Sequence, residues 1–160
     1  MFEKFEEQEA VKKSAMIEKN GFAFYSQLIE KFNDPKILEI LKKLRDDEKK
    51  HLHTIENRYF KEVGFGDTIT EEEVEVELYV ENKGIPDLFT RNIDMKKLVA
   101  SIDKPRQALE LAMDTERHSV VFFENLAKEA STEEARHIYT ALANEEKGHV
   151  EQIRVILETL

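Results

Sequence analysis

The sequence contains a duplicated set of glutamate and histidine residues. Each half has one isolated glutamate and, 30 residues later, a Glu-x-x-His pattern. The six residues are Glu18, Glu48 and His51 in the first half and Glu116, Glu146 and His149 in the second. Each residue of the second half lies 98 positions after its counterpart. Because carboxylate and imidazole groups are suitable ligands for Fe(II) or Mn(II), the set predicts a duplicated metal site.

A single Glu-x-x-His pattern carries little information in this chain. Glutamate makes up 26 of the 160 residues, and a third copy, Glu134 with His137, has no partner set. We therefore expect His137 to be a surface residue, and His53 and His118 to be solvated or to support a ligand. Without metal, the duplicated set would be a pair of salt-bridged helical hairpins. The common offset favours the metal site.

Four amphipathic helices are predicted to hold these residues. Apolar residues recur at helical spacing over about 3–32, 35–63, 105–130 and 132–159. Asp34 is the expected N-cap of the second helix, with Pro35 as its first residue. Ser131 is the expected N-cap of the fourth helix, with Glu134 reaching back as in a capping box. The candidate ligands interrupt the apolar stripes, so they should point into the core.

The spacing also predicts the topology. Each isolated glutamate lies about 15 residues before a helical turn, and each Glu-x-x-His pair lies about 15 to 18 residues after it, so an antiparallel hairpin brings all three to one level. Two hairpins related by a pseudo-two-fold axis run up-down-down-up. The second and third helices are then parallel, and they need a long crossover, which we place at 64–103.

A crossover of this length should carry structure of its own. Val74 to Val80 alternate as a strand would, but their glutamate-rich setting favours a short helix. Another helical turn is expected near Met95 to Ser101. We expect residues 1–160 to form a single domain.

Four buried carboxylates need compensation, because even one unpaired buried carboxylate costs several kcal/mol. Two divalent cations would neutralise all four. One glutamate from each of two helices and Glu-x-x-His from each of the other two is the known arrangement of di-iron and di-manganese sites in ferritin-like bundles. We therefore expect an all-α, ferritin-like four-helix bundle with two iron ions per chain, with manganese or a mixed Fe/Mn pair as the alternative.

At these residues the sequence resembles the rubrerythrin branch of the ferritin-like superfamily, over nearly the whole chain. The resemblance implies that Glu48 and Glu146 bridge the two metals. It also implies terminal ligands, which would be the carboxylates of Glu18 and Glu116 and the imidazoles of His51 and His149. Tyr25, seven residues after Glu18, matches a tyrosine of the family pattern, and we assign it a supporting role in catalysis.

Acids preceding the Glu-x-x-His glutamates are expected to orient the imidazoles across the bundle, which selects Asp47 and Glu145. The chain departs from rubrerythrins proper at two positions. Ser119 replaces a further glutamate, and Phe123 occupies the place of a second tyrosine. The chain also lacks a rubredoxin-like iron domain. These departures imply a more symmetric site and an outside electron donor.

Composition excludes several other functions. The formal charge of −10 disfavours nucleic acids and anionic membranes as partners. No apolar run approaches the roughly 18 residues of a membrane span, and the N-terminus lacks the pattern of a signal peptide, so we expect a cytoplasmic protein. The absence of cysteine excludes disulfides, thiolate metal sites and iron–sulfur centres within this chain.

These features predict a di-iron redox protein that reacts with hydrogen peroxide or dioxygen in oxidative-stress protection. Its electrons would come from an external donor such as a rubredoxin-type protein. The alternatives are a ferroxidase that handles iron, which would need a hollow multi-subunit shell for storage, and a metal-stabilised structural bundle. The family resemblance and the apolar residues Phe2, Phe5, Phe60 and Phe65 predict a homodimer.

Overall fold

Helices make up nearly all of the described part of the chain. The computed structural model describes residues 2–55 and 95–160, and it describes side chains for 10–55 and 96–160. The helices are α1 (Phe2–Lys31), α2 (Pro35–Ile55), α5 (Met95–Ala100), α6 (Pro105–Glu129) and α7 (Glu133–Thr159). The prediction of an all-α four-helix bundle is confirmed. The predicted extension of α2 to Val63 and the expected helix at Val74 to Val80 fall outside the described residues.

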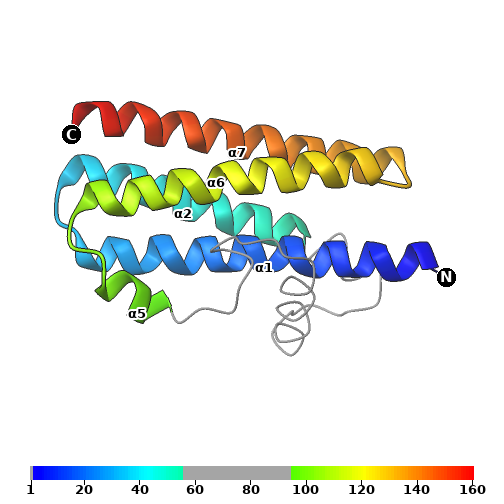
Figure 1. Ribbon diagram of the computed structural model, residues 1–160, viewed down its shortest axis with the longest axis horizontal. Coiled ribbons are helices and arrows are strands. Elements are labelled where there is room, and N and C mark those ends of the chain that lie inside the picture. The colour runs from blue at the N-terminus through cyan, green and yellow to red at the C-terminus, as the bar shows by residue number, and fades with distance from the viewer. Residues whose placement is uncertain (1, 56–94) are drawn as a thin grey trace.

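The four long helices are arranged as two antiparallel hairpins (Figure 1). α1 packs along α2, and α6 packs along α7, while α2 also contacts α7 and α1 contacts α6. Following the chain in Figure 1, α2 and α6 run in the same direction, and α1 and α7 run in the opposite one. The bundle is therefore up-down-down-up, as the spacing of the glutamates predicts. Within the described residues, no helix is both long and apolar enough to cross a membrane.

The second helix of each hairpin, α2 or α7, begins with a side chain that caps its N-terminus. Asp34 Oδ1 accepts hydrogen bonds from the backbone nitrogens of Lys36 at 2.9 Å and Ile37 at 3.3 Å, which confirms it as the N-cap of α2. The predicted cap of the last helix is wrong by one residue. Thr132, not Ser131, is the N-cap of α7, and its hydroxyl accepts from the Ala135 nitrogen at 3.1 Å.

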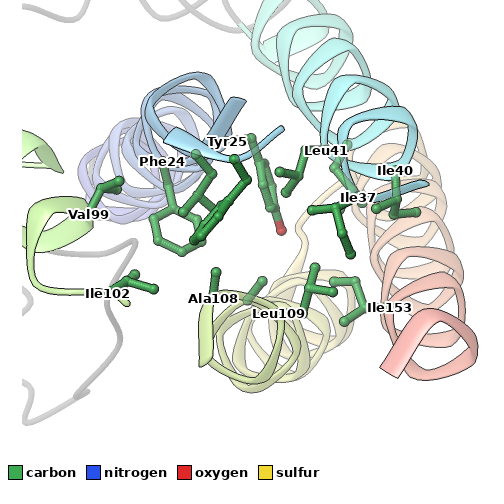
Figure 2. Close-up of a cluster of buried hydrophobic side chains, with 14 of the residues drawn as sticks. Phe24, Tyr25, Ile37, Ile40, Leu41, Val99, Ile102, Ala108, Leu109 and Ile153 are labelled. Atoms are coloured by element: carbon green, nitrogen blue, oxygen red, sulfur yellow. The ribbon is translucent and has the colours of Figure 1, made fainter. Parts of the chain in front are cut away.

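The core consists of two apolar clusters separated along the bundle axis. One contains Phe24, Leu28, Leu44 and Leu109, and part of it is shown in Figure 2 with contributions from all four long helices. The buried members of the other cluster are Val11, Ala15, Ile55, Phe123, Ala127, Ala135, Tyr139, Leu142 and Ala143. In α2, α6 and α7 the candidate ligands lie between members of the two clusters, and in α1 Glu18 directly follows Ile17 of the first cluster. The bundle thus holds one polar layer between two apolar ones.

The short helix α5 fixes the chain before it enters α6. It packs on α1, and Val99 and Ile102 are buried in the first cluster. Lys31, at the end of α1, donates from Nζ to the carbonyl oxygens of Val99 at 2.7 Å and Ala100 at 3.3 Å, and also to that of Ile102. A cation at the C-terminus of a helix satisfies carbonyls that have no partner within the helix. The predicted turn near Met95 to Ser101 is confirmed.

The assignment of Thr132 as the N-cap of α7 can be tested by substitution. Thr132→Ala should lower the free energy of unfolding by about 1 kcal/mol, because the Ala135 nitrogen loses its side-chain acceptor. Ser131→Ala, at the neighbouring exposed position, should change it by less than about 0.5 kcal/mol. Urea unfolding followed by circular dichroism measures both variants. A larger loss in Ser131→Ala would restore the original prediction.

Candidate metal centre

The structure brings the six predicted residues together in the polar layer, one glutamate from each of α1 and α6 and a Glu-x-x-His pair from each of α2 and α7. None is more than 3% exposed: Glu18, Glu48, His51, Glu116, Glu146 and His149. They form two groups of four, and in each group one ligand atom per residue lies within 4.8 Å of the others. Glu48 and Glu146 belong to both groups. Within the described residues, no other histidine, aspartate or glutamate joins either group.

The helical spacing explains why the groups form at one level. Residues three apart on a helix share a face, so Glu48 and His51 project together from α2, and Glu146 and His149 from α7. The two antiparallel turns then bring the isolated glutamates of α1 and α6 to the same height. Apolar clusters lie on both sides of this layer.

Glu146 spans the two halves of the site. Its Oε1 atom lies 3.3 Å from Nδ1 of His51, and its Oε2 atom lies 3.3 Å from Nδ1 of His149. His149 Nδ1 is also 3.4 Å from Glu48 Oε1 and 3.5 Å from Glu116 Oε1. Each histidine therefore directs Nδ1 at the shared carboxylate, and the two rings stack with centroids 5.7 Å apart.

The other nitrogen of each histidine contacts an acid on the opposite helix. His149 on α7 has Nε2 at 3.2 Å from Oδ2 of Asp47 on α2. His51 on α2 makes the reciprocal contact from Nε2 to Glu145 on α7. The predicted pairing of Asp47 and Glu145 with imidazoles across the bundle is confirmed. An Nε2 proton donated to these acids leaves the Nδ1 lone pair free to bind a metal.

Tyr25 reaches across the bundle to the other hairpin. Its hydroxyl donates to Oε1 of Glu116 at 2.7 Å, and Figure 2 shows the hydroxyl pointing between the helices. Burial, together with the nearby charge of Glu116, raises the pKa of Tyr25 well above its ordinary value. The phenol therefore keeps its proton and acts as a donor. The structure places Tyr25 at the site, and its role in catalysis stays a prediction.

Burial dominates the acid–base properties of the carboxylates. Burial, with the charge of Glu146, raises the pKa values of Glu18 and Glu48, and it raises the pKa of Glu116 to about 8. Burial alone would also raise the pKa of Glu146, but interactions with Glu116 and the two histidines hold it below its ordinary value. Glu146 is thus the carboxylate that most strongly keeps its negative charge.

The histidines supply the balancing charge. Burial by itself would lower the pKa values of His51 and His149, but the surrounding carboxylates raise both well above the ordinary value. Protons on the imidazoles and on some of the carboxyls therefore compensate the buried charge when no metal is bound. Metal binding must displace these protons.

The residues fit a pair of divalent cations. Several buried polar atoms of the cluster have no hydrogen-bond partner in the described part of the chain. These atoms are Glu18 Oε1, Glu48 Oε1, Glu116 Oε2, both carboxylate oxygens of Glu146 and His149 Nδ1. Such atoms are costly in an apolar interior unless something binds them. A donor set of carboxylate oxygens and imidazole nitrogens, without thiolates, suits Fe(II) or Mn(II).

The other three histidines and Ser119 lie outside the two groups of candidate ligands. His53, His118 and His137 are exposed, as predicted for residues without a duplicated partner set. Ser119 is buried, and its hydroxyl donates to the Thr115 carbonyl at 3.2 Å. The residue at the position of the additional family glutamate is therefore satisfied by its own helix.

An up-down-down-up bundle with this carboxylate–histidine layer defines a ferritin-like protein with a duplicated metal-site motif. A family model described as rubrerythrin matches residues 9–157, and the chain belongs to the rubrerythrin family. Neither the search of curated proteins nor the search of solved structures gave a match. The resemblance drawn from the sequence is thereby confirmed.

The raised pKa values predict how the metal-free protein responds to pH. Between about pH 4.5 and 8, folded Glu116 keeps a proton that the unfolded chain has lost, so stability should fall as the pH rises, by up to about 1.4 kcal/mol per pH unit for one proton. The histidines act in the same direction above their ordinary pKa of 6.5. Glu116→Gln keeps an acceptor for Tyr25 but removes the titration, so its profile should be flatter. Urea unfolding in chelator from pH 5 to 8 measures this.

The matched control is Glu39→Gln, which removes an exposed glutamate of α2. Its stability profile should run parallel to that of the wild type. If Glu116→Gln also runs parallel to the wild type, Glu116 does not hold the additional proton.

Proposed function

We propose that this chain is a di-iron redox protein that reacts with hydrogen peroxide or dioxygen and is reduced by an external electron donor. One observation carries the proposal: the two groups of four buried ligands share Glu48 and Glu146. Two shared carboxylates between two otherwise separate ligand sets are what a dinuclear site requires. Membership in the rubrerythrin family supports iron as the metal and peroxide as a substrate.

In this proposal each residue has a defined role. Glu18 and His51 would hold one metal, Glu116 and His149 would hold the other, and the shared pair would bridge them. When bound, two iron ions supply two one-electron redox steps, so that a two-electron oxidant can be reduced without release of a radical.

The surrounding residues prepare the site for this chemistry. The acids behind the imidazoles, Asp47 and Glu145, fix the ring orientation and the tautomer. Phe123, which is fully buried in the cluster on one side of the polar layer, limits access of bulk water. The Tyr25 hydroxyl holds one carboxylate and provides a proton donor within the same buried layer.

The electron donor is proposed to be a separate protein of the rubredoxin type. The chain has no cysteine, so it cannot carry a thiolate-bound iron centre of its own. We also retain the homodimer as a proposal.

Anaerobic loading with Fe(II), followed by peroxide or oxygen in a stopped-flow spectrometer, tests the function. The wild type should bind two irons per chain and develop ferric absorbance. Glu48→Gln and Glu146→Gln each remove a charged shared ligand, so the rate should fall by more than about 100-fold, beyond the usual effect of losing a residue that merely orients a ligand. Elemental analysis of the native protein identifies the metal.

The chain provides its own control in the third Glu-x-x-His pattern. Glu134→Gln and His137→Ala lie on the exposed part of α7 and should leave iron content and rate unchanged. The proposal would be wrong if the wild type developed no ferric absorbance, or if the two variants of the shared glutamates reacted as fast as the two control variants. Light scattering during iron loading tests the storage alternative, which requires a large shell and far more than two irons per chain.

A further inference from the structure

The two halves of the site have equivalent ligands but different hydrogen bonds. Tyr25 donates to Glu116 Oε1 at 2.7 Å, and both side chains are buried. The residue 98 positions after Tyr25 is Phe123, which is also buried but carries no polar atom. The repeat therefore gives Glu116 a donor and offers no equivalent donor to its counterpart, Glu18.

The donor to Glu116 is rigidly placed. Tyr25 belongs to the same apolar cluster as Phe24, and the two rings lie 5.5 Å apart. Its hydroxyl occupies Oε1 of Glu116, while Oε2 has no hydrogen-bond partner in the described residues. Glu116 is thus held by one oxygen and leaves the other free to bind a metal.

Among the described residues, Glu18 has no such support. Its Oε2 atom lies 3.2 Å from Nδ1 of His51, and its Oε1 atom has no hydrogen-bond partner in the part of the chain that the structure describes. Glu48 also hydrogen-bonds to Glu18. His51 and Glu48 are themselves candidate ligands, so metal binding would engage both groups that orient Glu18.

The two acids that contact the histidines, Asp47 and Glu145, differ in how exposed they are, and the difference again favours the half with Glu116. Asp47, which contacts His149, has 21% of its side chain exposed, whereas Glu145, which contacts His51, has 60% exposed. An exposed side chain is more mobile, and its charge is more strongly screened by solvent. Both supporting contacts therefore favour the half of the site that contains Glu116 and His149.

We propose that the two metal positions are unequal, that the position of Glu116 and His149 binds a divalent metal more tightly and fills first, and that Tyr25 is the positioning residue responsible. This inference rests on the dinuclear site of the proposed function. Residues that orient a metal ligand typically change metal affinity by about 10–100-fold. Within the described residues, only the half with Glu116 and His149 has such a residue for both its carboxylate and its imidazole. The protein should consequently pass through a form with one metal as metal is added.

Titration of chelator-treated protein with Co(II), followed by calorimetry and visible absorption, tests this inference. The wild type should bind two ions in steps whose Kd values differ by about 10–100-fold. Tyr25→Phe should weaken the tighter step until the two steps merge. The reciprocal variant Phe123→Tyr should tighten the weaker step. Tyr139→Phe removes the hydroxyl of a buried tyrosine outside the ligand groups and should leave both steps unchanged.

Two further variants assign the steps to positions. His51→Gln should keep the tighter step, and His149→Gln should keep only the weaker one. Equal wild-type steps, an unchanged titration in Tyr25→Phe, or equal weakening of both steps would overturn the inference while leaving the dinuclear site intact. Absence of Co(II) binding in the wild type would overturn both. Circular dichroism of every variant verifies that it is folded.

Discussion

The structure depends on compensation of charge in the middle of the bundle. Four carboxylates and two imidazoles occupy one layer, and none of the six is more than 3% exposed. Isolated charges in such an environment would destabilise the fold by several kcal/mol each. The apolar clusters on both sides give the bundle its core, and they also exclude the water that would otherwise solvate the layer. The residues of the proposed metal site therefore also affect stability, because an uncompensated charge in this layer would destabilise the bundle.

The topology follows from the need to bring two equivalent ligand sets to one height. Each hairpin supplies one set, and a pseudo-two-fold relation between the hairpins places the shared glutamates, Glu48 and Glu146, in both ligand groups. This relation makes α2 and α6 parallel, so the end of α2 and the start of α6 lie at opposite ends of the bundle. The start of α6 is fixed by α5 and by Lys31, which binds the carbonyls at the C-terminus of α5.

The clustering of the six candidate ligands and the fold could be predicted from the sequence because they obey a repeat, whereas the supporting contacts could not be fully predicted. The acids that precede the Glu-x-x-His glutamates indicate Asp47 and Glu145, and the offset of 98 residues selects the six clustered residues from 26 glutamates and five histidines. It does not indicate which histidine nitrogen faces inward, nor that Tyr25 on α1 binds a carboxylate on α6. Those contacts depend on side-chain rotamers and on the exact approach of the helices. The sequence pattern misplaces the cap of α7, because Ser131 and Thr132 are adjacent and both residue types cap helices well.

The pKa shifts explain how the bundle can exist with and without the proposed metals. Burial raises the pKa of Glu116 to about 8, and the carboxylates raise the pKa values of both histidines, so protons neutralise the layer in the metal-free protein. Metal ions and protons then compete for the same atoms, and each ion that binds must release protons. A fixed donor such as the Tyr25 hydroxyl takes no part in that exchange, since its raised pKa keeps the proton on the phenol. It therefore holds Glu116 in both states. Glu18 is held through His51 and Glu48, which are themselves candidate ligands, and this difference separates two halves that have the same candidate ligands.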